Sequence, residues 1–89
     1  MMLEVQFSNY SKKFIKNNKS NPALKKIATI IEDLLSNPLA TGSKKLVGYP
    51  FYRVRIGNYR IVYKYDQKFL YVTIIDKRDK VYDSLNKIG

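Results

Sequence analysis

Residues 52–63 read YRVRIGNYRIVY and predict two β-strands joined by Gly57-Asn58, a residue pair typical of a two-residue hairpin turn. A turn of this length fixes the register, so that residue 56 faces 59, 55 faces 60, 54 faces 61 and 53 faces 62. One face of the hairpin is aromatic and aliphatic, with Tyr52, Val54, Ile56, Tyr59, Ile61 and Tyr63. The other face is basic, with Arg53, Arg55, Arg60 and Lys64, and Val62 among them.

The basic face contains an unfavourable pair of side chains. The register places Arg55 directly opposite Arg60, with β-carbons about 5 Å apart, where like charges destabilise a sheet. A surface that needed only to be soluble would mix charges of both signs. Two interpretations remain at this point. The face is either a solvated basic surface or, as we favour, a binding site for an anion that offsets the repulsion.

Composition supports an anionic partner. The chain has 89 residues, enough for a single domain over residues 1–89 with one modest core. Its formal net charge is +10, from 17 Lys+Arg against seven Asp+Glu. This excess predicts either a nucleic acid or an acidic protein as partner. All four arginines fall between Arg53 and Arg78, which indicates where the anion binds, since arginine forks onto phosphate or carboxylate with fixed geometry.

Absent residues exclude several kinds of chemistry. The chain has no Cys, and therefore no disulfide, thiol nucleophile or Cys-type zinc site. It has no His, the usual general base and commonest metal ligand. Its few acidic residues are scattered, so we expect no metal site and no cofactor. No signal-peptide pattern or long apolar run is present, so we expect a cytoplasmic protein that is not associated with membranes.

The N-terminal half predicts one strand and two helices. Residues 3–7 alternate apolar and polar as in a short strand, and Ser8 or Asn9 could cap the helix that follows. Asn21-Pro22 begins a second helix with apolar residues at i, i+3, i+4 and i+7, and Asn37-Pro38 ends it. Residues 37–48 are expected to form a loop. Its Lys44-Lys45 pair either reaches a phosphate or is merely solvated.

The C-terminal half predicts a third hairpin strand and a tail. A turn near residues 66–68 leads to a strand over residues 69–75, and if residue 65 faces 70 the two faces keep their phase. The core face then gains Leu70, Val72 and Ile74, and the basic face gains Tyr71, Thr73 and Ile75. Val81, Leu85 and Ile88 could form one face of a short final helix. The predicted fold class is α+β, a strand, two helices, a three-stranded antiparallel meander and a short C-terminal tail or helix; the edge that the first strand joins stays open.

Three segments of the chain resemble the RelE/ParE superfamily of bacterial and archaeal toxins. They are LVGYP at residues 46–50, the hairpin at residues 52–63 and KRDKVY at residues 77–82, and RIGNYR within the hairpin is the most specific. The resemblance covers nearly the whole chain and implies a RelE-like domain that is the toxin of a toxin–antitoxin pair. On the RelE side, such toxins enter the ribosomal A site and cut the mRNA there. On the ParE side, they inhibit DNA gyrase without nuclease activity.

The resemblance also implies roles for individual residues. Arg60, Arg78 and Tyr82 match catalytic positions, and Arg53 and Arg55 match basic positions near the scissile phosphate. The alternatives without a catalytic role are a solvated strand end for Arg78 and a packed aromatic for Tyr82. Tyr71, on the predicted basic face, is a candidate for stacking on a base. Lys44 and Lys45 complete the expected substrate-binding set.

A metal-independent cleavage follows from these roles. The 2′-hydroxyl would attack the adjacent phosphorus, with Tyr82 as general base or as the group that orients this hydroxyl. Arg60 would hold the phosphate and Arg78 would stabilise the leaving group, because fixed cations favour the developing charge. The expected partners are mRNA on the ribosome, rRNA and an acidic antitoxin, which could form a hetero-oligomer with the toxin. The alternatives are a gyrase-binding toxin and an RNA-binding domain without activity.

Overall fold

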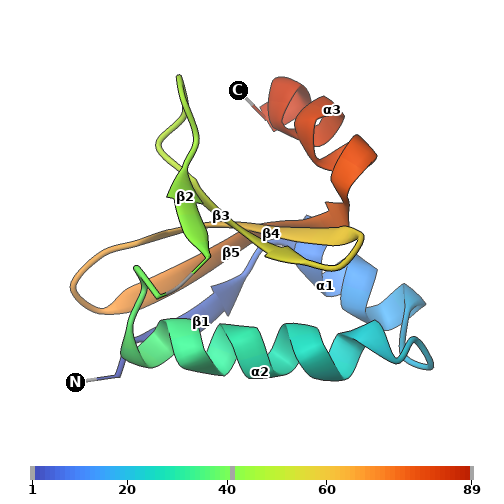
Figure 1. Cartoon of the computed structure of the whole chain (residues 1–89), viewed down its shortest axis with the longest axis horizontal. Helices are drawn as coiled ribbons and strands as arrows, with labels where there is room; N and C mark the ends of the chain where they lie inside the picture. The colour runs from blue at the N-terminus through green and yellow to red at the C-terminus, as the bar shows by residue number, and fades with distance from the viewer. Residues whose placement is uncertain (1, 41, 89) are drawn as a thin grey trace.

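Five strands form one sheet in the computed structural model, which describes residues 2–40 and 42–88 (Figure 1). The strand order is β1-β5-β4-β3-β2. The elements in chain order are β1 (Glu4–Phe7), α1 (Asn9–Asn17), α2 (Ala23–Ser36), β2 (Ser43–Lys45), β3 (Tyr52–Ile56), β4 (Tyr59–Tyr65), β5 (Phe69–Lys77) and α3 (Arg78–Ile88). The expected α+β class is confirmed, the three-stranded meander is β3-β4-β5, and the final helix forms.

The β3–β4 hairpin has the register that its turn predicts. Arg55 pairs with Arg60, and the other facing pairs are likewise those expected from the sequence. Gly57 has φ of +56°, a left-handed conformation that glycine adopts without strain and that this tight turn requires. The hairpin therefore fixes which side chains share a face before any other element packs on it.

A β-bulge in β5 corrects the predicted phase of its second half. Tyr63 pairs with Val72 as expected, but Val62 pairs with Ile74, so Thr73 has no partner in β4. Ile75 consequently lies in the main core and Ile74 on the opposite face, the reverse of the sequence expectation. Ser8, the residue before α1, meets β5 at this bulge: its N–H and its hydroxyl donate hydrogen bonds to the carbonyls of Val72 and Thr73.

The strands at the two edges of the sheet, β1 and β2, could not be placed from the sequence. β1 lies beside β5 and runs parallel to it, which settles the edge that the first strand joins. Residues 43–45, expected to be loop, form the short strand β2 and pair antiparallel with β3. The prediction of an unbroken loop over residues 37–48 was therefore wrong. A three-residue strand with two lysines lacks the apolar alternation by which strands are identified.

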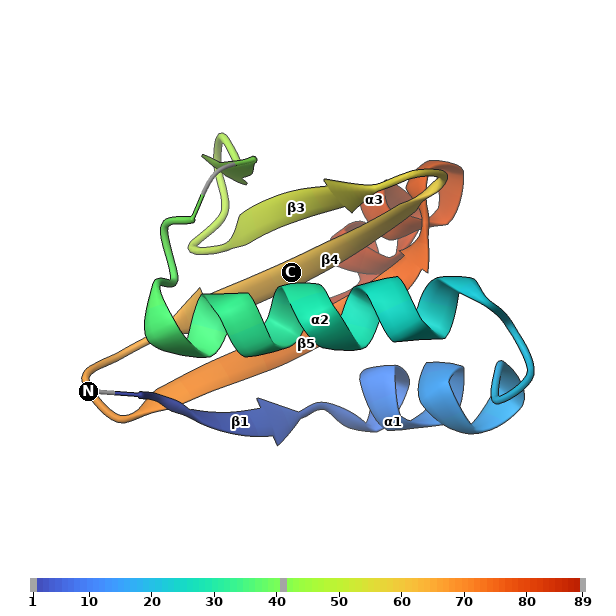
Figure 2. The ribbon, with the colours of Figure 1, turned by 60° about the horizontal axis from the view of Figure 1, so that its bottom comes forward.

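Helices α1 and α2 cover one face of the sheet (Figure 2). Ser8 caps α1 by accepting a hydrogen bond from the Ser11 N–H at 3.0 Å, and the Asn21 side chain accepts one from the Ala23 N–H at 3.0 Å at the start of α2. The main core lies under these helices. Its buried members are Ile27, Ile31, Leu34, Val54, Ile56, Ile61, Tyr63, Leu70, Val72 and Ile75.

Helix α3 lies on the other face of the sheet, where it builds a second, smaller core (Figure 1). Its Val81 and Leu85 are buried, as the predicted helix face requires, and the side chain of Ile88, the third residue of that face, lies outside the part that the structure describes. They pack in one cluster with Leu46, Phe51, Val62 and Ile74. The apolar Val62 among the basic residues is thereby explained, because it supports α3. Within the described residues, no helix is long and apolar enough to cross a membrane.

Candidate anion-binding site

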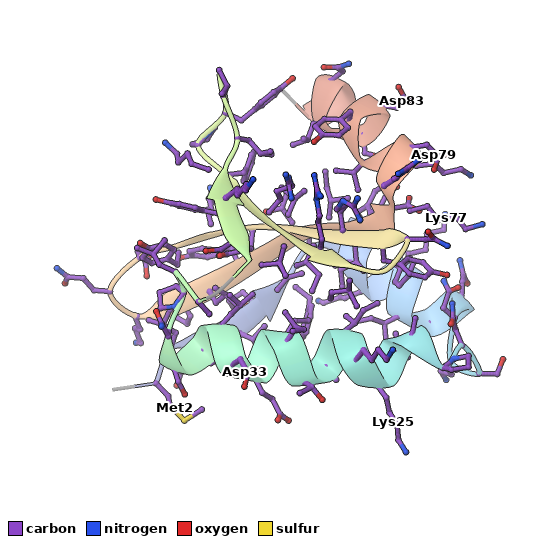
Figure 3. The ribbon with its side chains drawn as sticks, in the orientation of Figure 1. Met2, Lys25, Asp33, Lys77, Asp79 and Asp83 are labelled. Carbon is purple, nitrogen blue, oxygen red and sulfur yellow. The ribbon has the colours of Figure 1, made fainter. Side chains whose placement is uncertain are left out.

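Arginines from β3 and β4 line the sheet face beside α3. Arg53 and Arg55 alternate with the core residue Val54 along β3, so both project to the α3 side. Arg60 joins them from β4, directly opposite Arg55. Figure 3 shows nitrogen-bearing side chains rising from the sheet between β2 and α3. The sequence expectation that these three arginines share one face agrees with the register.

Arg60 is the buried centre of this group. Only 9% of its surface is exposed, and its Nη1 donates hydrogen bonds to the carbonyls of Gly57 at 3.0 Å and Tyr59 at 2.9 Å. No side-chain nitrogen in the described residues is both fully buried and without a partner. The guanidinium nitrogens of Arg60 that make no protein hydrogen bond therefore keep some contact with solvent. The turn carbonyls fix Nη1, and the other nitrogens can still donate to a ligand.

The surroundings of Arg60 repel its positive charge. Burial lowers the pKa of Arg60 below its ordinary value, and the charges of Arg55, Arg53 and Arg78 lower it further, in that order. Ionised Tyr82 would act in the opposite direction. Arg60 still carries its proton at neutral pH, because guanidinium groups start from a pKa above about 12. Four cations thus concentrate a positive potential that a phosphate or carboxylate would relieve.

Helix α3 brings Arg78 and Tyr82 to the same place. The backbone N–H of Arg78 donates to the carbonyl of Asn58 at 2.9 Å, which ties the start of α3 to the β3–β4 turn. Tyr82 follows one helical turn later and lies on the same side of the helix. Tyr82 is 51% exposed, whereas the neighbouring Val81 is buried against the sheet. Tyr82 is therefore not simply a packed core aromatic.

Of the remaining predicted site residues, the structure places one beside the arginines and two away from them. Lys44 pairs with Arg53 across the β2–β3 ladder and so shares its face. Lys45 projects to the other face, where its Nζ lies 5.9 Å from the centre of the Tyr52 ring. Tyr71 is opposite Lys64, four residues along β4 from Arg60, and its hydroxyl donates to Asp66 at 3.0 Å. The arginines, Lys44 and Tyr82 gather together, whereas Lys45 and Tyr71 lie apart from them.

Sequence reasoning missed two residues at the edge of this site. Asp76 of β5 is directly opposite Arg60, and Tyr10 of α1 donates a hydrogen bond to Asp76 Oδ2. The bulge at Thr73 places Asp76 there, and no local pattern indicates that bulge. A contact between residues 66 positions apart has no signal in a single sequence.

The site has the means for electrostatic stabilisation and few groups for proton transfer. Among the described residues, no group of three or more His, Cys, Asp or Glu lies close enough together to hold a metal ion. The fixed arginines can bind an anion and stabilise charge that develops on it. Tyr82 is the exposed titratable group beside them.

Comparisons with known proteins identify the family of the chain. The family model described as ParE toxin of type II toxin-antitoxin system, parDE, matches residues 5–82. The chain belongs to this toxin family. The RelE/ParE membership inferred from the hairpin and tail segments is thus confirmed. No curated protein sequence gives a significant match to the chain.

Solved structures of other toxins in this superfamily share the fold. A chain of the RelB–RelE antitoxin–toxin complex from Methanococcus jannaschii is 32% identical, with a TM-score of 0.64 over 88% of this chain and 95% of that chain. The YoeB/ParE toxin from Agrobacterium tumefaciens is 19% identical, with a TM-score of 0.76 over 85% and 99%. YoeB from Staphylococcus aureus is 22% identical, with a TM-score of 0.75 over 88% and 99%. The last two show likeness of fold alone.

Proposed function

We propose that this toxin is a ribosome-dependent endoribonuclease that cuts mRNA in the A site. The observation that carries the proposal is the convergence of Arg53, Arg55 and Arg78 on the nearly buried Arg60, with Tyr82 beside them. A surface that only binds a partner needs positive charge. It does not need one guanidinium that is hydrogen-bonded to turn carbonyls and surrounded by three other arginines. Such a fixed arrangement suits a phosphate that gains charge during a reaction.

The proposed reaction is attack of the 2′-hydroxyl on the adjacent phosphorus. Tyr82 accepts the proton of this hydroxyl or orients it, and the guanidinium nitrogens of Arg60 that make no protein hydrogen bond bind the phosphate oxygens. Arg53 and Arg55 add positive charge around the phosphate, and Lys44 extends the basic surface along the RNA backbone. The bond from phosphorus to the 5′ oxygen breaks as the 2′ oxygen bonds to phosphorus; Arg78 stabilises the departing 5′ oxygen, which takes its proton from ordered water or rRNA. Roles for Lys45 and Tyr71 in binding more distant nucleotides remain part of the proposal.

The weak set of proton-transfer groups explains why a ribosome would be needed. Guanidinium groups transfer protons poorly, because their pKa lies above about 12. Orientation of the reacting groups alone can contribute about 7–11 kcal/mol to catalysis. A ribosome that holds the mRNA and supplies rRNA groups would provide this orientation. Free RNA would then be cut slowly or not at all.

Primer extension on translated mRNA tests this function. The wild-type toxin should produce A-site cleavage on ribosome-bound mRNA and little cleavage of the same RNA without ribosomes. Arg60→Ala and Tyr82→Phe should each reduce cleavage by at least about a hundredfold. Lys16→Ala, on the exposed surface of α1, is the control and should cut normally. Equal cutting of free and ribosome-bound RNA would contradict the ribosome dependence.

The second candidate function is inhibition of DNA gyrase, which the match to the ParE family model favours. A toxin of that kind acts by binding and needs no general base. The double variant Arg60→Ala/Tyr82→Phe separates the two functions in a growth assay. Toxicity that survives in this variant, together with inhibited supercoiling by gyrase, would replace the nuclease proposal. Toxicity of the wild type on expression would itself exclude an inert RNA-binding domain.

We further propose an acidic antitoxin as the partner that silences this site. Solved relatives include the YoeB–YefM complex from Staphylococcus aureus and the RelB–RelE complex from Methanococcus jannaschii. For a chain of net charge +10, an acidic antitoxin segment over the arginines would relieve their mutual repulsion in a toxin–antitoxin hetero-oligomer. Coexpression should restore growth, and the complex should dissociate more readily as salt is raised.

A further inference from the structure

The carboxylate of Asp76 is placed where it would be expected to neutralise Arg60. The two residues are directly opposite each other on β5 and β4. Side chains at such positions have β-carbons about 4.5–5.5 Å apart, and opposite charges there normally pair. In the described part of the chain, however, no hydrogen bond or ion pair joins Asp76 to Arg60, whose recorded acceptors are the carbonyls of Gly57 and Tyr59.

Asp76 is occupied by other donors. Its Oδ2 accepts a hydrogen bond from the hydroxyl of Tyr10, and its Oδ1 accepts the backbone N–H of Lys77 at 2.8 Å. The Tyr10 oxygen in turn accepts a hydrogen bond from the Ser84 hydroxyl of α3 at 2.9 Å. Both carboxylate oxygens are therefore directed toward α1 and the end of β5. Lys13 is the other charged residue lining the hollow of about 260 Å³ that Asp76 and Tyr10 share.

Tyr10 is held firmly in the position that this contact needs. Ser8, which caps α1, and Ser11, in its first turn, lie on either side of Tyr10 and are anchored on β5. The Ser8 N–H donates to the Val72 carbonyl at 3.0 Å, and the Ser8 hydroxyl donates to the Thr73 carbonyl at 2.6 Å. The fully buried Ser11 hydroxyl donates to the Val72 carbonyl at 3.0 Å. The bulge that turns Asp76 toward Arg60 thus also fixes the residue that restrains Asp76.

We propose that Tyr10 is a positioning residue that holds the Asp76 carboxylate away from Arg60 and so keeps Arg60 available to a phosphate. Without the Tyr10 hydroxyl, the carboxylate swings to the guanidinium opposite it and occupies the anion site from within. The inference rests on the proposed function for its ligand, the RNA phosphate. The restraint on Asp76 needs no catalytic step, so it can be tested apart from cleavage.

Binding of an uncleavable RNA tests the proposal. A short single-stranded 2′-O-methyl RNA lacks the attacking hydroxyl, and its affinity is measured by fluorescence anisotropy at low salt. Tyr10→Phe keeps the ring but removes the donor, and it should weaken binding about tenfold, the effect of losing one charge-assisted contact. Its affinity should also depend less on salt, by about one counterion. Unchanged affinity in Tyr10→Phe would overturn the proposal.

A second substitution separates positioning from a merely structural role. In Tyr10→Phe/Asp76→Asn the residue opposite Arg60 has no charge, so affinity should return to within about twofold of the wild type. A general loosening of the fold by Tyr10→Phe would not be rescued in this way, and failure of the rescue would overturn the proposal. Ser84→Ala is the matched control, because it removes the bond from α3 to Tyr10 but leaves the Tyr10–Asp76 bond. It should change affinity less than twofold.

Inorganic phosphate distinguishes this inference from the proposed nuclease function. The Nε–Hε signal of Arg60 in NMR spectra should shift on addition of phosphate in the wild type and Asp76→Asn, and much less in Tyr10→Phe. This result in a protein that cuts no mRNA would contradict the nuclease function and leave the role of Tyr10 standing. Equal phosphate shifts in the wild type and Tyr10→Phe would overturn the role of Tyr10.

Discussion

Arg60 shows how one residue can be unfavourable for stability and favourable for binding. Its guanidinium is 9% exposed, and both burial and three neighbouring arginines lower its pKa. Each of these effects makes the charged form less stable in the folded protein than in water. An anion that binds at this position removes part of that cost. The arginine site therefore destabilises the folded protein most when no anion is bound. Such a loss of stability is common at functional sites.

Reversing the charge of Arg55 tests this balance at the level of one residue. Arg55→Glu replaces the repulsion across the β3–β4 pair with attraction to Arg60, and it should raise the free energy of unfolding by about 0.5 kcal/mol at low salt. RNA binding should fall at the same time. Urea denaturation and RNA titration measure the two effects.

Lys16→Glu makes the same change in net charge on exposed α1 and serves as the control for binding. It should weaken RNA binding less than Arg55→Glu does. An unchanged or lower free energy of unfolding in Arg55→Glu would show that Arg55 and Arg60 do not repel each other appreciably.

The β4–β5 turn is an element held by one carboxylate. Asp66 Oδ1 accepts the backbone N–H groups of Phe69 at 2.7 Å and Lys68 at 2.8 Å, and Oδ2 accepts the Tyr71 hydroxyl. The Phe69 N–H, followed by the Lys68 N–H, lowers the pKa of Asp66 below its ordinary value, and the Tyr71 hydroxyl adds to this. The carboxylate form is therefore favoured in the folded protein.

This shift predicts how the turn responds to acid. Because the folded-state pKa of Asp66 lies below its unfolded value of about 3.9, the stabilisation is present above that pH and is lost as pH falls through the folded-state pKa. Asp66→Asn should lose less stability than the wild type between about pH 5 and pH 2, as measured by thermal unfolding. Asp33→Asn, on the exposed surface of α2, is the control. Parallel pH profiles for the wild type and Asp66→Asn would contradict the prediction.

Local signals explain which elements could be predicted from sequence. The hairpin register followed from Gly57-Asn58, and the ends of α2 followed from its Asn-Pro pairs. Strand β2, the parallel pairing of β1 and the bulge at Thr73 depend on contacts with distant segments. The candidate site divides in the same way. The alternation of side chains along the hairpin predicted that Arg53, Arg55 and Arg60 share a face. Arg78 and Tyr82 were assigned to the site only through the family resemblance. No local pattern indicated Tyr10 or Asp76.

At the scale of the whole molecule, one sheet separates two cores of different size. Helices α1 and α2 close the larger core on one face, and α3 closes the smaller one on the other. Of the α3 side chains that the structure describes, Val81 and Leu85 are buried in the smaller core. A helix held by so few apolar side chains can open while the rest of the fold stays intact.

Leu85→Ala tests whether α3 is an independent layer. The substitution leaves a cavity under α3 and should destabilise its packing by about 2–3 kcal/mol. Amide hydrogens of α3 should then exchange faster, while those of β4 and β5 keep most of their protection. Leu34→Ala, which makes the same change in the larger core, should lower protection across the sheet. An equal loss of protection in all elements of Leu85→Ala would mean that α3 does not open separately.

The extra residue at Thr73 has a consequence for comparing this toxin with its relatives. Deletion of that one residue would make β5 a regular strand, with Ile75 still facing the larger core and Asp76 still opposite Arg60. An ungapped alignment through this strand would therefore equate interior positions with exterior ones in any homologue that lacks the insertion. Homologues of different strand length are best matched from the Gly57-Asn58 turn outward, and the gap belongs where α1 meets the strand.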